Sequence, residues 1–463
     1  MRFTKPLVLV AALGLVVAAC SPSTSTDTTE APTATTQAPT ADTTAPAADT
    51  TTSEAMQGLA FDVGFDEATG TIKVGALAAI TGPIAGIGAS LLGGHQVYWA
   101  GVNANGGIAG VYPIDVVVRD NAYNPETNVI VYNEIKDEVL GFSSAIGTPT
   151  TATIFEDAAA ANIIVAAGSL ASQWALTSNV VLNLASGTYF AQFANAAYWA
   201  MEVADPAVIT ADSVVGIIYP ADDYGQDCKN GYDFGQENQG FNAAYEATYA
   251  PTDTDFSGQI GGAAAAGVDV LFVCTTPTPL ATMLGTAAAI EYSPAVLGSS
   301  PSYNPVLPGA LGGGDEAAGL ALFSSFPYYG LGAGPSFEDE TPGMADLRAD
   351  LEAYGTDLPP EAINAFYFFG YAQAQTFHAI LETAVANGDI SRAGLLAAID
   401  MVQNVDLGYG LGPVGYGPTP AERIPTNLDN IGVPVSITEK TFGLAPVTDF
   451  YAAPYMEDWD PAG

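Results

Sequence analysis

The stretch that decides the fold covers residues 72–110 and has the sequence IKVGALAAITGPIAGIGASLLGGHQVYWAGVNANGGIAG. Within its first residues, Ile72, Val74, Ala76 and Leu77 form a short apolar run that is typical of a buried parallel strand. Thr81-Gly82-Pro83 ends that strand, and apolar residues recur at helical spacing over residues 90–102. The stretch therefore predicts a strand, a loop, a helix and a glycine-rich turn, which together make the first βα unit of an alternating fold.

The same alternation continues through two further groups of segments. After the opening unit, strands are expected at residues 114–118, 141–146 and 163–167, with helices between them. The pattern restarts near residue 214, with strands expected at 214–219, 241–249, 268–273 and 295–297. Short loops between alternating strands and helices predict parallel sheets that are covered by helices on both faces. The restart predicts a second α/β domain.

The first 70 residues have a different composition. Residues 1–19 combine early positive charge, a short apolar run and small residues, which is typical of an export signal. Cys20 follows these small residues and resembles the lipobox cysteine of bacterial lipoproteins; the alternative is an ordinary signal peptide with an incidental cysteine. Residues 21–70, rich in Thr, Ala and Pro at their start, are expected to form a flexible tether. The chain is therefore expected to be exported and held at the cell surface or in the periplasm by a lipid on Cys20.

The charge balance excludes several classes of partner. The chain has 50 Asp and Glu against 10 Lys and Arg, a net charge of −40. Nucleic acids and anionic membranes need basic patches, so we expect neither as a partner. No D-x-D-x-D-G loop occurs and the chain has two histidines, so we expect no metal site. His378 and the aromatic residues around it are expected to pack in a helix.

Several motifs in this order resemble one known family. Residues 72–75 and Thr81-Gly82-Pro83, followed by VNANGGI at 102–108, are similar to the opening strand, loop and turn of type I periplasmic binding proteins. Within that group, the likeness is to the branched-chain amino acid and amide receptors of ABC importers. Further matches are Asp120-Asn121, Asn124-Pro125, the GTPTT stretch at 147–151 and Tyr224-Gly225. The likeness runs from about residue 72 to residue 452.

The resemblance implies the architecture. It predicts two Rossmann-like lobes with parallel sheets, joined by three crossovers, with the ligand held between them. In this chain the N-lobe would comprise residues 71–190 and 328–410, and the C-lobe residues 191–327 and 411–463. Open α/β sheets bind ligands outside the carboxyl ends of their strands, and each candidate site residue below follows a strand.

The N-lobe candidates lie in three loops. The GTPTT stretch carries Thr148, Thr150 and Thr151 at a predicted helix start, where free N–H groups favour an anion. The resemblance implies that this loop holds a ligand carboxylate, and the alternative is a plain capping turn. A second loop has Ser169, Leu170 and Ala171, with Trp174 close enough to wall the pocket or to pack in the core. Residues 84–88 form the third loop, with Ile87 where the family often has an aromatic residue.

The C-lobe candidates are Asp223, Tyr224, Thr276 and Ser300. Tyr224 stands where the resemblance implies an aromatic ligand contact. Ser300 replaces the acidic residue that neutralises an α-ammonium group in the amino-acid receptors. Either Asp222 or Asp223 supplies that charge, or the ligand is not a standard amino acid; amides, urea-like molecules and small carboxylates remain open.

The remaining two cysteines are expected to pair. With Cys20 assigned to the lipid, Cys228 and Cys274 form an even pair in an oxidising compartment. Cys228 is predicted in the first turn of a C-lobe helix and Cys274 at the carboxyl end of the neighbouring strand, so both lie at the same edge of the sheet. A disulfide fits if their Cα atoms lie within roughly 7 Å.

These features predict a receptor. We expect it to capture a small polar molecule of the amino acid or amide class by hinge closure and to deliver it to an ABC permease. No nucleophile elbow, P-loop or HExxH motif occurs, so we expect neither catalysis nor a cofactor. The alternatives are a ligand-sensing or adhesive surface lipoprotein on the same fold, and a hydrolase hidden in the cleft.

Overall fold

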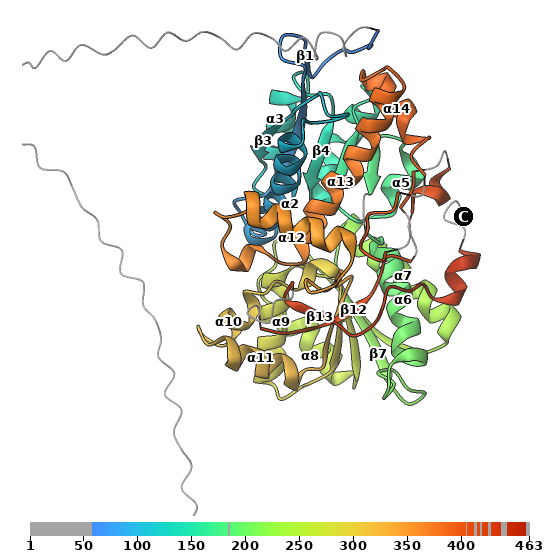
Figure 1. The fold of residues 1–463 in the computed structure, drawn as a ribbon. Helices are drawn as coiled ribbons and strands as arrows, with labels where there is room; N and C mark the ends of the chain where they lie inside the picture. Colours follow the sequence, from blue (N-terminus) through green and yellow to red (C-terminus); the bar gives the residue numbers. More distant parts are fainter. Residues whose placement is uncertain are drawn as a thin grey trace, which may run out of the picture. The chain divides into compact units, whose positions relative to one another are not determined.

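Two mainly parallel sheets with helices around them make up the part of the chain that the structure describes (Figure 1). This computed structural model describes residues 58–183, 186–403, 405–411, 414–416, 419–424, 427–436 and 442–459. The expected export signal, Cys20 and residues 21–57 of the tether lie outside the described residues.

The first sheet forms the core of the N-lobe. Its parallel strands lie in the order β3-β2-β4-β5-β6, and β1 pairs antiparallel with β2. The strands are β1 (Phe65–Asp66), β2 (Thr71–Ala78), β3 (Ile114–Asp120), β4 (Phe142–Ile146), β5 (Val165–Gly168) and β6 (Val181–Asn183). The helices around them are α2 (Ala85–Ala104), α3 (Pro125–Ile135), α4 (Thr148–Ala160), α5 (Gln173–Thr177), α12 (Pro342–Tyr354), η3 (Pro360–Ala362), α13 (Ala365–Ala386), α14 (Arg392–Ile399) and η4 (Pro420–Arg423).

The second sheet forms the core of the C-lobe. Its order is β13-β12-β11-β10-β9-β7-β8, in which β12 and β13 run antiparallel to their neighbours. The strands are β7 (Val214–Pro220), β8 (Asn242–Tyr249), β9 (Val270–Val273), β10 (Ala295–Gly298), β11 (Tyr328–Leu331), β12 (Ile431–Pro434) and β13 (Leu444–Pro446). The helices are α6 (Tyr189–Tyr198), η1 (Trp199–Val203), α7 (Asp223–Gln239), α8 (Ser257–Ala265), α9 (Pro277–Ala289), η2 (Ser300–Ser302), α10 (Leu307–Leu311), α11 (Glu316–Ser325) and η6 (Pro454–Asp458).

The central strands have the composition that burial on both faces requires. All residues of β4 (FSSAI) and of β9 (VLFV) are buried. Strands covered by helices on both faces bury every side chain, so they need continuous small or apolar residues instead of an alternating pattern. The two parallel sheets confirm the expected α/β class with two lobes.

The chain passes three times between the lobes, and two boundaries differ from the expected ones. β11 pairs with β10, so residues 328–331 belong to the C-lobe and not to the N-lobe as expected. Tyr416 packs in the N-lobe core with Ile72 and Trp99, so the N-lobe continues past residue 410. Strand pairing and long-range packing decide these limits, and neither is visible in a local pattern.

The expected tether, residues 21–70, also extends too far at its C-terminal end. Leu59, Phe61 and Phe65 pack against the N-lobe core, and β1 pairs with β2. The Asp62 carboxylate accepts a hydrogen bond from the Arg392 N–H at the start of α14. Residues 58–70 are therefore part of the N-lobe, because they carry large apolar side chains, of which residues 21–57 have only Met56.

Candidate functional site

A cavity lies between the lobes at the carboxyl ends of both sheets. About 720 Å³ of space free of protein atoms lies between its walls, part of which is open solvent. The N-lobe contributes residues that follow β2, β3, β4 and β5, and the C-lobe contributes residues that follow β7, β9, β10 and β11. Both sheets therefore direct their strand ends toward one space, as the rule for open α/β sheets predicts.

The N-lobe wall is mainly apolar. Ile84, Ile87 and Leu91 line the cavity from the start of α2, and Phe366 and Phe369 line it from the start of α13. Ile87 lies in the first turn of α2, not in a loop as expected. The aromatic residues of α13 do pack in the core, but Phe366 and Phe369 also face the cavity.

Close packing of α2 on α13 brings the two phenylalanines to the cavity. A Cβ atom at Gly94 would lie 1.9 Å from the Tyr367 carbonyl oxygen, and one at Gly370 would lie 2.0 Å from the Leu91 carbonyl oxygen. The two glycines therefore allow the helix backbones to touch. Asn364 caps α13 by accepting hydrogen bonds from the backbone N–H groups of its first turn, which fixes where the helix begins.

The start of α4 is the polar end of the N-lobe wall. Gly147 has φ 102°, and the helix begins at Thr148, which lines the cavity. The Thr148 hydroxyl is 2.7 Å from the Ser169 hydroxyl, which accepts a 2.8 Å hydrogen bond from Trp174 Nε1. The Tyr189 hydroxyl also hydrogen-bonds to the Thr148 side chain. Thr148 therefore joins a helix start, with its unsatisfied N–H groups, to a chain of hydroxyls.

Six of the expected ligand-binding residues do not line this cavity. The Thr150 hydroxyl donates back to the Gly147 carbonyl at 2.9 Å, and α4 has no side-chain cap. Thr151 and Ala171 are buried, and Ser169 and Trp174 lie behind Thr148. Asp223 is exposed and lines a separate pocket with Trp174. Ile87, Thr148, Leu170, Tyr224, Thr276 and Ser300 do line the cavity.

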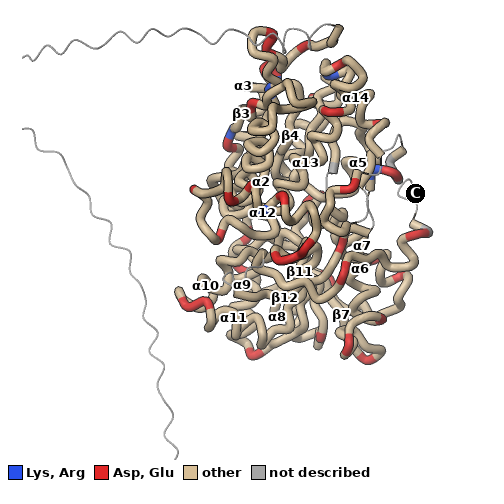
Figure 2. Tube along the Cα trace, viewed as in Figure 1, with Lys and Arg blue, Asp and Glu red and all other residues tan. Residues whose placement is uncertain are grey.

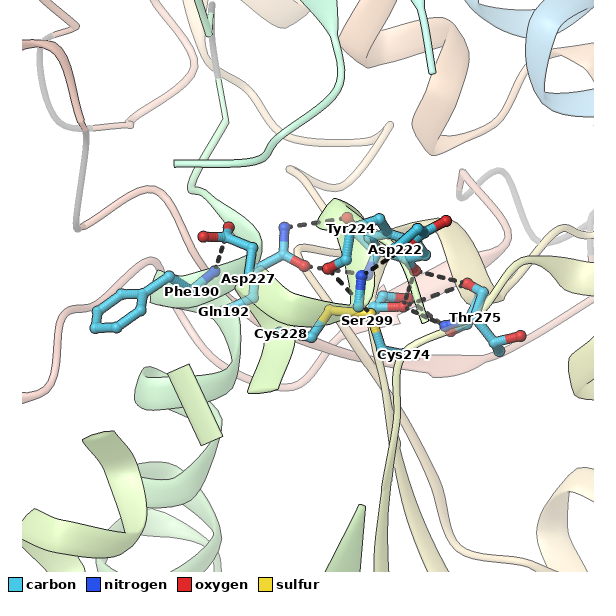
Figure 3. Close-up of a disulfide and its surroundings, with 12 residues drawn as sticks. Phe190, Gln192, Asp222, Tyr224, Asp227, Cys228, Cys274, Thr275 and Ser299 are labelled. Atoms are coloured by element: carbon cyan, nitrogen blue, oxygen red, sulfur yellow. Dashed lines mark hydrogen bonds between the residues drawn. A yellow bond between two sulfur atoms is a disulfide. The ribbon is translucent and has the colours of Figure 1, made fainter. Parts of the chain in front are cut away.

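Tyr224 presents its ring to the cavity and its hydroxyl to the C-lobe. The hydroxyl donates to the Thr275 carbonyl at 2.8 Å and lies 2.6 Å from the Ser299 hydroxyl (Figure 3). The Tyr189 ring is 4.5 Å from the Tyr224 ring, between centroids. Burial raises the pKa of Tyr224 well above its ordinary value, so the phenol stays neutral. Tyr224 therefore acts as an aromatic wall instead of a hydrogen-bond donor to the cavity.

A disulfide fixes the helix that carries Tyr224. Cys228, one turn further along α7, is bonded to Cys274 at the end of β9, with a Cα–Cα distance of 6.2 Å (Figure 3). The two cysteines pair as the sequence led us to expect. The bond attaches the first turns of α7 to the sheet directly below the cavity.

The sequence interpretation missed several lining residues. Tyr123, Tyr189, Phe366 and Phe369 add four aromatic rings to the lining. Tyr123 follows β3 and has φ 54°, and a Cβ at Gly147 would lie 2.6 Å from its ring. Tyr123 was open to prediction, because it comes soon after a strand and next to the Asp120-Asn121 motif. The phenylalanines were not, because their position depends on helix packing.

The cavity contains no formal charge. None of the described residues that line it is Asp, Glu, Lys, Arg or His. Asp and Glu residues are instead spread over both lobes (Figure 2). The nearest acidic residue in the sequence to Tyr224, apart from the exposed Asp223, is Asp222, whose Oδ1 accepts the Gly225 N–H at 3.0 Å and caps α7. The site therefore offers apolar surface and neutral hydroxyls.

The lobes touch beside the cavity as well. The Asp227 carboxylate of α7 accepts hydrogen bonds from the N–H and hydroxyl of Ser172 in the N-lobe and, at 3.1 Å, from the Phe190 N–H. Burial raises the pKa of Asp227 to about 6. Elsewhere, a Cβ at Gly86 of α2 would lie 3.3 Å from the Asn304 amide nitrogen of the C-lobe. The structure therefore has the two lobes in contact.

The fold and this site can be compared with known proteins. The family model described as "Periplasmic binding protein" matches residues 71–424, most of the chain. The chain belongs to the type I periplasmic binding proteins. The family is one of solute-binding proteins, and the resemblance stated from the motifs is confirmed.

Solved structures agree with this assignment. A fatty acid ABC transporter substrate-binding protein from Thermomonospora curvata is 25% identical, with a TM-score of 0.76, over 87% of this chain and 97% of that chain. A branched-chain amino acid ABC transporter protein from Thermus thermophilus with bound valine is 15% identical, with a TM-score of 0.68, over 86% and 99%. A solute-binding protein from Rhodopseudomonas palustris HaA2 in complex with p-hydroxybenzoic acid is 19% identical, with a TM-score of 0.66, over 83% and 98%. The last two show the fold alone.

No curated protein matches the sequence of this chain.

Within the described part of the chain, no helix is both long enough and apolar enough to cross a membrane.

Proposed function

We propose that this periplasmic binding protein is the exported receptor of an ABC importer and that it captures a small carboxylic acid with an apolar body. The observation that carries the proposal is the uncharged cavity between the lobes, with aliphatic and aromatic walls and a few hydroxyls. This ligand differs from the polar amino acid or amide that the sequence led us to expect, because the apolar side chains of α2 and α13 face the site.

The carboxylate end of the ligand is assigned to the start of α4. The first N–H groups of a helix have no acceptor within the helix, and its dipole favours a negative charge there. Thr148 lines the cavity at this point, with its hydroxyl among those of Ser169 and Tyr189. The resemblance stated from the motifs implies a ligand carboxylate in the same loop, which supports this assignment.

The way both lobes line the site supports closure about a hinge. Ile87, Thr148 and Leu170 come from the N-lobe, and Tyr224 and Ser300 from the C-lobe, so a ligand that touches both sets stabilises the closed arrangement. Ser186 and Gly332 line the cavity from two crossovers, where the chain would bend. A lipid on Cys20 would keep the receptor near its permease in the membrane.

A thermal-shift screen of the full chain tests this proposal. The panel contains 4-methylpentanoate, 3-phenylpropanoate, octanoate, acetamide and urea. At 100 times its dissociation constant a true ligand adds about 2.7 kcal/mol to the free energy of unfolding, so at least one of the three acids should raise the melting temperature clearly. X-ray scattering of the same sample should show a smaller radius of gyration for the closed form.

Matched variants localise the effect. Ile87→Asp places a charge in the apolar wall at a helix start that tolerates it, and we expect it to abolish the shift. Ile130→Ala changes a side chain of α3 that is 61% exposed and should leave the shift unchanged. If amides or urea shift the melt and the acids do not, the ligand class is wrong; if no compound binds, the receptor proposal loses its support.

A further inference from the structure

The C-lobe end of the cavity presents a serine where amino-acid receptors of this family were expected to have an acid. Ser300 begins η2, directly after β10, and lines the cavity. The resemblance stated from the motifs implies that this position meets the α-ammonium group of an amino acid. Whether this cavity accepts an ammonium therefore depends on Ser300 and on the groups that surround it.

Gln192 of α6 holds Ser300 in place. The side-chain nitrogen Nε2 of Gln192 donates to the Ser300 hydroxyl at 3.0 Å, and the Ser300 backbone N–H donates to the side-chain oxygen Oε1 of Gln192 at 3.1 Å. Gln192 is 1% exposed. Gly332 covers the pair, since a Cβ there would lie 3.2 Å from both Gln192 Nε2 and Ser300 Cβ. Two neutral groups thus satisfy each other at this end of the cavity.

The acidic residues that follow β7 do not offer a carboxylate to the cavity. Asp222 uses Oδ1 to cap α7 at the Gly225 N–H and does not line the cavity. Asp223 is exposed and faces a different pocket. Asp227 accepts its hydrogen bonds from Ser172 and Phe190. The sequence left two hypotheses open: either Asp222 or Asp223 supplies the negative charge, or the ligand carries no ammonium group. This geometry favours a ligand without an ammonium group.

We infer that Ser300, positioned by Gln192, makes the cavity selective for acids that carry no ammonium group over the α-amino acids with the same skeleton. The inference rests on the proposed receptor function and names the specificity of that site. An ammonium that leaves water needs a carboxylate or several acceptors, and without them its burial is strongly unfavourable. Ser300 offers one neutral hydroxyl, which already accepts a hydrogen bond from Gln192, and no charged side chain lines the cavity, so the site discriminates by withholding a carboxylate partner.

Calorimetric titration of the full chain with two matched pairs tests this inference. The pairs are 4-methylpentanoate with leucine and 3-phenylpropanoate with phenylalanine; each pair differs only by the amino group. We expect the acid of at least one pair to bind about 100-fold more tightly than its amino acid, or better. An amino acid that binds as tightly as its matched acid overturns the inference but leaves the receptor function intact. If neither member of either pair binds while another compound of the screening panel does, the inference alone falls; if nothing binds, the receptor function falls with it.

Variants of the two residues separate selectivity from simple structural damage. Ser300→Asp should move the ratio of the two affinities at least tenfold toward the amino acid, whereas Ser300→Ala, which adds no charge, should leave the acid preferred. Gln192→Glu keeps the shape of the side chain and adds the charge one residue further away, so it should move the ratio in the same direction. Gln192→Met removes the hydrogen bonds and should weaken both ligands without changing their ratio. An unchanged ratio in both Ser300→Asp and Gln192→Glu would contradict the role of this pair, and the second variant keeps the test decisive if the first does not fold.

Discussion

The two lobes have the same order of parallel strands but give the cavity different surfaces. In each lobe the first parallel strand of the sheet lies between the second and the third, as the orders β3-β2-β4 and β8-β7-β9 show. The N-lobe contributes aliphatic and phenyl side chains together with one helix start. The C-lobe contributes tyrosine rings and hydroxyls, and both Tyr224 and Ser300 are hydrogen-bonded within the lobe. Tyr224 lies on α7, the helix that the disulfide fixes. The fold thus decides where the site lies, and the residues after each strand decide its chemistry.

The largest expected difference between the lobes comes from the disulfide. Cys228 and Cys274 are 46 residues apart, and closing a loop of that length stabilises the folded protein by about 4 kcal/mol in the chain-entropy model. The double variant Cys228→Ser with Cys274→Ser should lose about that free energy of unfolding in urea denaturation. Because the disulfide fixes the start of α7, which carries Tyr224, the double variant should also bind the ligand less tightly.

A reducing agent supplies the control for this variant. The wild-type protein in excess dithiothreitol should unfold at the same urea concentration as the double variant in the same buffer. If the double variant keeps the stability of the oxidised wild type, hydrogen bonds and packing alone hold α7 on the sheet, and the disulfide does not distinguish the two lobes in stability.

The sequence predicted the position of the site better than the side chains that face it. Thr148, Leu170, Tyr224, Thr276 and Ser300 lie within a few residues of the end of a strand, and they line the cavity as the strand-end rule predicts. The rule does not say which side of a loop or helix a residue faces. Thr150 follows Thr148 by two positions in the same helix, and a turn of about 100° per residue carries it to the opposite side. Thr151 lies nearly one full turn beyond Thr148, where it is buried and does not reach the cavity.

Residues far along the chain were beyond local patterns. Phe366 and Phe369 belong to α13, which enters the N-lobe only after the chain has passed through the C-lobe. Their place depends on contact between α13 and α2 at Gly94 and Gly370, which no spacing of apolar residues reveals. The adjacent Asp223 and Tyr224 show the same limit, since one faces a different pocket and the other lines the cavity.

A smaller effect is expected where the lobes meet at Asp227. Burial raises its pKa to about 6, above the value near 3.9 of an unfolded chain, so the folded protein binds the proton more tightly. This contribution to stability is fully present below pH 3.9 and is lost as the pH rises through 6. Relative to Asp227→Asn, the wild type should lose about 2 kcal/mol of unfolding free energy between pH 4 and pH 7.

The asparagine variant is a close match for the protonated acid. Its carbonyl oxygen can accept from the Ser172 and Phe190 N–H groups, and its NH₂ can donate to the Ser172 hydroxyl, which turns to accept. Urea denaturation at half-unit pH steps gives the difference between the two curves, which removes the pH dependence of the remaining acidic surface. Parallel curves would mean that Asp227 titrates as an ordinary carboxyl and that the lobes are not coupled through its protonation.

The smallest effect compares one hydroxyl from each lobe. Thr148→Val keeps the shape of the N-lobe side chain that lines the cavity and removes its hydroxyl, so the affinity for a bound acid should fall about tenfold, the effect of one lost hydrogen bond. Tyr224→Phe removes a hydroxyl that is already bonded to Thr275 and Ser299, so it should lower the free energy of unfolding by about 1 kcal/mol and leave the affinity within about twofold. Calorimetric titration with the acid that binds best gives the affinity of each variant, and urea denaturation gives the free energy of unfolding of each. If Tyr224→Phe weakens binding as much as Thr148→Val does, the tyrosine hydroxyl turns toward the ligand on binding, and the C-lobe is then the more adaptable wall of the two.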